Sequence, residues 1–213
     1  HTAYRRQRQM CIRDRIYIIG DSYFQEHKNN WLERCFSKLN YDIVNLANGG
    51  ESFWKQFDNL ECLSEDKNFS NIKYCIVGWS DPCRPYIKGD PINDSSIDFE
   101  YRRAVAILRY VNKILYSRYS HIKFINYFCF PYLPTFPAPK WGEQESYFTF
   151  DNQITCFPSM HDLTYKIYGE ACQGKDNHLS DNQHEEMSNI LYSTIVSQQR
   201  SGIVDLKKVT YEK

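Results

Sequence analysis

Short apolar runs alternate with amphipathic stretches along most of this chain. Runs typical of buried strands cover residues 16–19, 41–46, 72–77 and 122–130, and each ends close to glycine, asparagine or proline. Between and after them, apolar side chains recur at helical spacing over 24–39, 53–60, about 99–119 and 180–196. Strands that alternate with helices predict a parallel sheet covered by helices on both faces.

The segment after the fourth run interrupts this pattern. Four prolines between residues 131 and 139 exclude regular structure, so 131–146 is expected to form an ordered coil or a flexible flap. Because it follows the fourth strand, the proline-rich segment from Phe130 to Trp141 is expected to wall or cover a site. The start of the final helix is well marked by contrast, because Ser180 and Gln183 form a capping-box pattern.

The first 14 residues differ from the rest of the chain. They show no apolar periodicity, and Met10–Asp14 looks like a translated sequencing-adapter sequence. We therefore expect residues 1–14 to be non-native and residues 15–213 to form a single domain of ordinary size. Because this segment hides the native start, the absence of a visible signal peptide does not decide the localisation.

Composition excludes several classes of protein. The 26 basic and 26 acidic residues balance, so we expect no nucleic-acid partner, and no run approaches the roughly 18 apolar residues of a membrane span. Of the eight cysteines, all but Cys11 lie beyond the discounted segment, and none forms a Cys-x-x-Cys pair. We expect buried thiols rather than a metal site, which favours a reducing compartment such as the cytoplasm.

Gly20-Asp21-Ser22 places a serine where the first strand hands over to a helix. Backbone N–H groups at a helix N-terminus are unpaired and lie at the positive end of the helix dipole, so such a serine sits beside donors for an oxyanion. The same tripeptide is also ordinary turn or N-cap chemistry. Ser22 is therefore a candidate nucleophile that needs partners at the other strand ends.

Those strand ends supply further polar segments. In parallel sheets ligands bind beyond the carboxyl ends of the strands, and here the second strand is followed by Asn48-Gly49-Gly50 and the third by residues 78–81. Acyl transfer also requires a base. Among the histidines, His178 stands out because it lies in a polar loop that leads directly into the final helix, whereas His27, His121 and His184 are more simply explained as solvated.

Four short blocks, in this order, resemble those of the SGNH (GDSL-like) hydrolases. Gly20–Ser22 matches the nucleophile block, Asn45–Gly50 the second, Gly78–Asp81 the third, and Asp176 with His178 the last, so the resemblance spans residues 15 to about 196. It implies a three-layer α/β/α sandwich with a flavodoxin-like parallel sheet, the SGNH hydrolase fold. It also implies hydrolysis of an ester without a cofactor or metal ion.

The resemblance assigns a role to each matched residue. Ser22 would attack the ester carbonyl, His178 would take its proton, and Asp176 would orient the imidazole. The backbone N–H groups of Ser22 and Gly50 and the side chain of Ser80 would bind the oxyanion.

Two positions depart from the family pattern. Ser80 stands where the family carries an asparagine, and its hydroxyl is shorter than an amide. The acidic residue of the last block stands two residues before His178 instead of three, a position that Lys175 holds here. Asp176 can still reach the ring from a turn, and Asp181, at the start of the final helix, is the alternative orienting acid.

Three further residues are candidates for substrate binding. Arg84 would clamp a carboxylate or phosphate, Trp79 would stack on a sugar ring, and Asp21 lies beside the nucleophile. A solvated Arg84 is equally compatible with the sequence.

Several alternative functions are compatible with these candidate residues. An esterase or acetylesterase, acting on a small-molecule ester or an O-acylated carbohydrate, is the function we predict. An acyltransferase that uses the same acyl-enzyme and a relative that has lost its chemistry and binds a ligand are the alternatives. A nucleotide- or flavin-binding domain is a remote fourth, since the chain has neither Gly-x-Gly-x-x-Gly nor a Walker motif.

Overall fold

One parallel sheet organises the chain. The computed structural model describes residues 13–25, 30–80, 103–104, 106–129, 153–157, 160, 179, 181–197 and 201–206. Within these ranges six strands form a sheet in the order β2-β1-β3-β4-β5-β6, and every neighbouring pair is parallel. The strands are β1 (Arg15–Ile19), β2 (Asp42–Asn45), β3 (Ile72–Trp79), β4 (Lys123–Phe128), β5 (Gln153–Phe157) and β6 (Gly202–Asp205).

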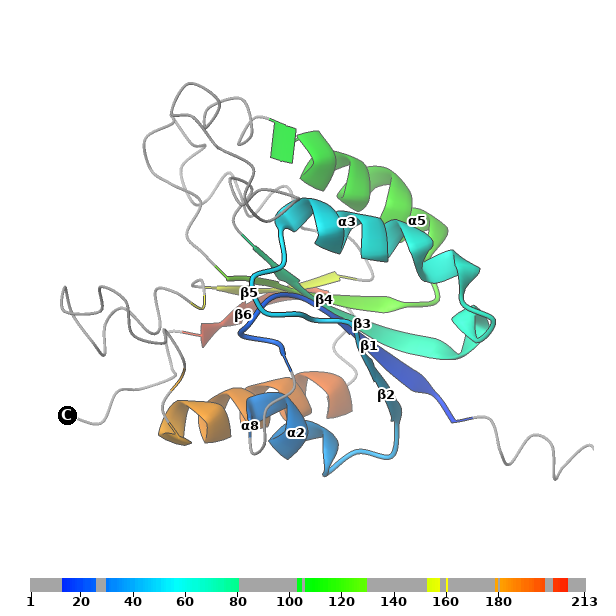
Figure 1. Ribbon diagram of the computed structural model, residues 1–213. Coiled ribbons are helices and arrows are strands. Elements are labelled where there is room, and N and C mark those ends of the chain that lie inside the picture. Colours follow the sequence, from blue (N-terminus) through cyan, green and yellow to red (C-terminus); the bar gives the residue numbers. More distant parts are fainter. Residues whose placement is uncertain are drawn as a thin grey trace, which may run out of the picture.

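Helices cover both faces of this sheet (Figure 1). α2 (Trp31–Phe36) and α8 (Asp181–Val196) lie against one face, and α3 (Phe53–Glu61) and α5 (Tyr116–Arg118) against the other. Short 3₁₀ helices, η1 (Cys62–Glu65) and η2 (Phe69–Asn71), connect α3 to β3. The three-layer α/β/α sandwich expected from the sequence is confirmed.

The alternating side chains of each strand build two cores. Ile16 and Ile18 of β1 pack with the residues of α2 and α8, whereas Tyr17 and Ile19 pack with those of α3 and with the helical residues that lead into α5. Successive side chains of a strand point to opposite faces, so a strand with apolar residues at every position needs cover on both sides.

The first helix begins later than the apolar spacing predicts. Residues 22–25 form a turn, in which Phe24 N–H donates to Asp21 O at 2.9 Å, and α2 begins only at Trp31. Asn30 sets that start, because its side chain accepts from Glu33 N–H at 2.8 Å and so satisfies an unpaired amide of the first turn. The prediction of one continuous helix over 24–39 was therefore wrong.

Other differences have equally local causes. The predicted helix ending near residue 119 contains a π-helical segment, η3 (Val111–Leu115), directly before α5. β5 and β6 were not predicted, since runs of five and four residues carry little periodicity. Cysteines 35, 75, 129 and 156 are buried as expected, but Cys62 is exposed on η1.

A single aromatic ring joins the ends of β1 and β3. The fully buried Phe24 lies against the backbone of Gly20, where an added Cβ would come within 2.8 Å of Phe24, and of Gly78, where it would overlap the ring itself. The ring also contacts Trp31 and Tyr127, with centroids 5.4 and 5.5 Å away. Glycine is required at both strand ends because the ring occupies the space of a side chain.

We expect Gly78→Ala to lower the free energy of unfolding by about 1–3 kcal/mol, because the new methyl group overpacks against Phe24. The loss should shrink in a Phe24→Leu background, where the ring is absent. Urea denaturation of the wild type, both single variants and the double variant measures this coupling. Strictly additive losses would contradict the packing argument.

Candidate active site

The direction of α8 shows at which ends of the strands, amino or carboxyl, the helix begins. In its first turn His184 Nδ1 accepts a hydrogen bond from Trp31 N–H at 3.2 Å, at the start of α2, which follows β1. Near its other end, Ile195 O accepts from the hydroxyl of Tyr74, close to the start of β3, at 3.1 Å. α8 therefore runs antiparallel to the strands and begins at their carboxyl edge.

The position of the start of α8 concerns the residues expected to act as base and orienting acid, because they lie just before or at the start of this helix in the sequence. Asp181 is the first residue of α8, so the helix that follows His178 in the sequence starts at the edge where Ser22 lies. His178 and Asp176 themselves, like Arg84, lie outside the described residues. Their roles stay predictions.

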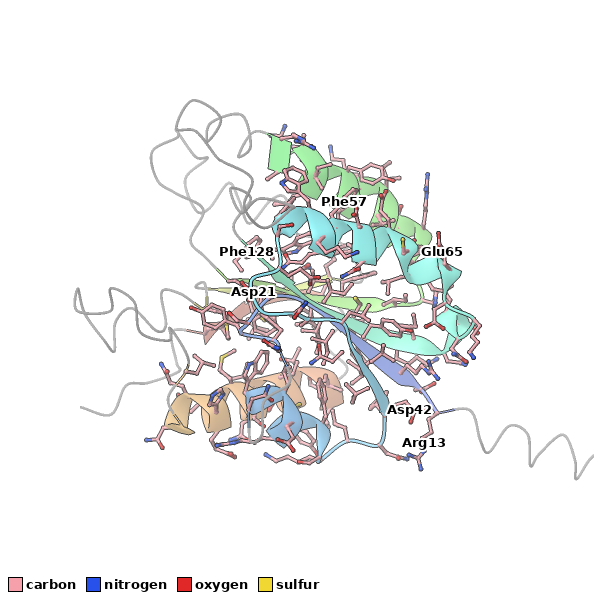
Figure 2. All side chains as sticks on the ribbon, viewed as in Figure 1. Arg13, Asp21, Asp42, Phe57, Glu65 and Phe128 are labelled. Carbon is pink, nitrogen blue, oxygen red and sulfur yellow. The ribbon has the colours of Figure 1, made fainter. Side chains whose placement is uncertain are left out.

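Asp21 anchors the turn that carries Ser22. Its carboxylate is completely buried, and its Oδ1 accepts from Tyr23 N–H at 3.1 Å while its Oδ2 accepts from the hydroxyl of Ser80 at 3.2 Å. Figure 2 shows Asp21 beyond the end of β1, at the carboxyl edge of the sheet. Ser22, which is half-buried, is thus held between two residues whose polar groups are fixed.

Ser80 lies directly beside this turn, at the end of β3. It is 1% exposed, its backbone N–H donates to Gln56 Oε1 at 2.8 Å, and its hydroxyl donates to Asp21. A serine hydroxyl has one proton, so the proton expected on the oxyanion is directed at Asp21 here. The oxyanion role of Ser80 stays a prediction, and its structural role is to link β3 to the Ser22 turn.

The Gly50 loop reaches the same edge. Asn48 N–H donates to Gly20 O at 3.2 Å, which ties this loop to the end of β1, and Glu51 N–H donates to Asn48 O at 3.1 Å to close a turn. Gly50 is the third residue of that turn with φ +77°, the position at which a type II turn requires glycine. The structure brings Gly50 to the edge where Ser22 lies, and its oxyanion role stays a prediction.

Two residues expected to touch substrate are packed inside. Trp79 is 1% exposed, its indole N–H donates to Asn126 Oδ1 at 3.0 Å, and its ring centroid lies 5.2 Å from that of Phe53. Asp21 is fully buried, as described above. Their surroundings favour supporting roles, and substrate contact by either side chain stays a prediction.

Two of the three histidines expected to be solvated make structural contacts, and the third, His27, lies outside the described residues. His184 is half-buried and accepts the first amide of α2, and the exposed His121 places Nε2 3.2 Å from Phe69 O. Neither position is that of a free surface side chain.

Glu51 is a titratable group at this edge that the sequence analysis did not single out. Its Oε2 is buried, and no described residue forms a hydrogen bond with it. Burial raises the pKa of Glu51 to about 7; Lys55 lowers it and the charge of Asp21 raises it further. The position of Glu51 directly after Gly50 was the one sequence signal that placed it near the candidate site. Its burial could not be predicted, because the burial of a glutamate in a loop depends on residues far along the chain.

Among the described residues, no group of three or more histidines, cysteines or acids is placed to hold a metal ion. In the same ranges, no helix combines the length and the apolar character needed to cross a membrane.

Comparison with known proteins gives structural matches only. No family model and no curated protein matches the chain. The psychrotrophic esterase EstA from Pseudoalteromonas sp., solved with monoethylphosphonate as inhibitor, is similar with a TM-score of 0.51 and 14% identity over 87% of this chain and 98% of that one. TesA has a TM-score of 0.48 and 12% identity, and a protein of the G-D-S-L family from Desulfitobacterium hafniense DCB-2 has 0.46 and 16%; each covers 85% of this chain and 98% of its own.

The likeness to the esterase defines the class of fold. The chain has a three-layer α/β/α sandwich with a flavodoxin-like parallel sheet, a fold similar to that of the esterase. At this level of identity the likeness concerns the fold, and chemistry has to be argued from the site.

We expect the stability of the protein to fall as the pH rises from about 4.5 to about 7 through the titration of Glu51. Its pKa is raised in the folded state from the ordinary 4.5, so between these values the folded protein binds more protons than the unfolded chain. Glu51→Gln removes this dependence. Above pH 7 its free energy of unfolding should exceed that of the wild type by about 1 kcal/mol, after allowance for solvent screening.

Urea denaturation at a series of pH values measures the difference. Glu65→Gln is the matched control, since Glu65 is exposed on η1 and lies across the molecule from Asp21 (Figure 2). Parallel pH profiles for wild type and Glu51→Gln would refute the assignment.

Proposed function

We propose that this protein is an ester hydrolase that acts through an acyl-enzyme on Ser22. The observation that carries the proposal is the placement of Ser22 at the tip of a buried, hydrogen-bonded turn, on the carboxyl edge to which the Gly50 loop and the start of α8 also come. This is the arrangement in which a nucleophile, backbone donors and a base from the final block can meet.

In the proposed reaction Ser22 Oγ attacks the carbonyl carbon of the ester while His178 takes its proton. The oxyanion is bound by the backbone N–H groups of Ser22 and Gly50, and Ser80 adds a third donor only where its hydroxyl gives up the hydrogen bond to Asp21. Collapse breaks the bond to the alcohol, which receives the proton from His178 and leaves. Water then attacks the acyl-enzyme and gives a proton to the same histidine. The bond between Ser22 Oγ and the acyl carbon breaks, the carboxylic acid leaves, and Ser22 Oγ takes the proton back from His178, while Asp176 or Asp181 orients the imidazole.

The similar esterase supports this reaction class, because a protein of the same fold carries the name of an ester hydrolase and was solved with a phosphonate inhibitor. A small-molecule or carbohydrate ester is the proposed substrate class. One observation favours a second function, a binding module without chemistry: the hydroxyl of Ser80 is bonded to Asp21.

We expect Ser22→Ala and His178→Ala each to lower the hydrolysis of a short-chain chromogenic ester by about 10⁴-fold or more. A fluorophosphonate should label the wild type at Ser22, as read by mass spectrometry of the modified peptide. Ser117→Ala is the control, because Ser117 is exposed and its hydroxyl donates to Ile114 O within its own helical segment.

Absence of both labelling and turnover in folded wild-type protein would overturn the proposal and favour the binding module. Transfer of the acyl group to an added sugar acceptor, with labelling of Ser22 intact, would instead make the protein an acyltransferase.

A further inference from the structure

We propose that Gln56 is a positioning residue for Ser22, acting through Ser80 and Asp21. The inference rests on the proposed function and adds to it a residue from α3 that none of the sequence blocks contains. Three hydrogen bonds in series carry it.

The first bond fixes the end of β3. Gln56 is completely buried, and its Oε1 accepts from Ser80 N–H at 2.8 Å. The donor is a backbone amide, so the amide oxygen of Gln56 has to face it and the side chain has one possible orientation. Since the N–H of Ser80 is buried at the end of a strand, it requires such an acceptor.

The next two bonds transmit this position to the nucleophile. Ser80 donates through its hydroxyl to Asp21 Oδ2 at 3.2 Å, and Asp21 Oδ1 accepts from Tyr23 N–H at 3.1 Å, one residue beyond Ser22. Gln56, Ser80 and Asp21 are each at most 1% exposed, so little solvent screens the series. Moving the end of β3 therefore moves the groups on both sides of Ser22.

The other half of the amide argues against a role in stability alone. Gln56 Nε2 is buried and has no hydrogen-bond partner among the described residues, and burial of an unpaired amide nitrogen lowers the stability of the fold. An apolar residue would remove that penalty but would leave Ser80 N–H unpaired. Gln56 is thus explained by the single acceptor it offers to the end of β3.

Gln153 provides a matched control within the same chain. It is also completely buried, on β5, but within the part of the chain that the structure describes neither polar atom of its amide has a hydrogen-bond partner. Gln153→Met and Gln56→Met make the same chemical change, and only the second removes a hydrogen bond.

The test is the hydrolysis of a short-chain chromogenic ester and the rate of fluorophosphonate labelling of Ser22. We expect Gln56→Met to lower kcat and the labelling rate by about 10- to 100-fold with KM within about twofold of wild type, because small misplacements of a nucleophile are costly. Gln153→Met should keep both rates. Gln56→Glu should recover most of the activity, since its buried, neutral carboxyl still offers a carbonyl oxygen to Ser80 N–H.

Each outcome decides the matter. Equal rates in wild type and Gln56→Met, or equal losses in Gln56→Met and Gln153→Met, would overturn the inference while the proposed function stands. Losses in Gln56→Glu as large as in Gln56→Met would also overturn it, because an acceptor at position 56 would then not be sufficient to position Ser22. Should Gln56→Met fail to fold, Gln56→Asn replaces it, since its shorter amide withdraws from Ser80. A wild type without labelling or turnover would remove both proposals.

Discussion

The packing of the Phe24 ring onto the backbone of Gly20 and Gly78 is the contact on which the site depends. It joins the carboxyl ends of β1 and β3 through one buried side chain that lies two residues after Ser22. The ring can lie there only because both strand ends lack a Cβ. Interiors are packed closely enough that the space of one methyl group cannot be shared, so the position of the Ser22 turn is set by apolar packing before any polar group acts.

Hydrogen bonds then fix the orientation of the Ser22 turn, whose position is set by the packing of Phe24. A buried carboxylate is tolerated only when its oxygens are paired, and Asp21 meets this condition by binding the turn on one side and Ser80 on the other. The polar groups therefore add direction to a turn that the Phe24 ring already holds. Such double support fixes the position of Ser22, as the proposed role of a nucleophile requires.

Features that depend on neighbouring residues in the sequence could be predicted, whereas features that depend on contacts between distant segments could not. Strands ending at glycine or asparagine could be located, and the rule for parallel sheets correctly brought Ser22, Gly50 and Ser80 to one edge. The start of α2 was misplaced because a cap overrides apolar spacing. Glu51 and Gln56 could not be found, since their properties arise from burial against segments distant in the chain.

The serine at position 80 has a mechanistic consequence for the proposed esterase. Its single hydroxyl proton cannot serve Asp21 and an oxyanion together, so with this hydrogen bond in place the proposed site would rely on the backbone amides of Ser22 and Gly50 as donors. Loss of one donor typically lowers a rate by about 10²- to 10³-fold, which slows an acyl-transfer site without abolishing it. With its proton on Asp21, Ser80 holds the turn that carries Ser22, and this arrangement is compatible with the slow hydrolase that we propose.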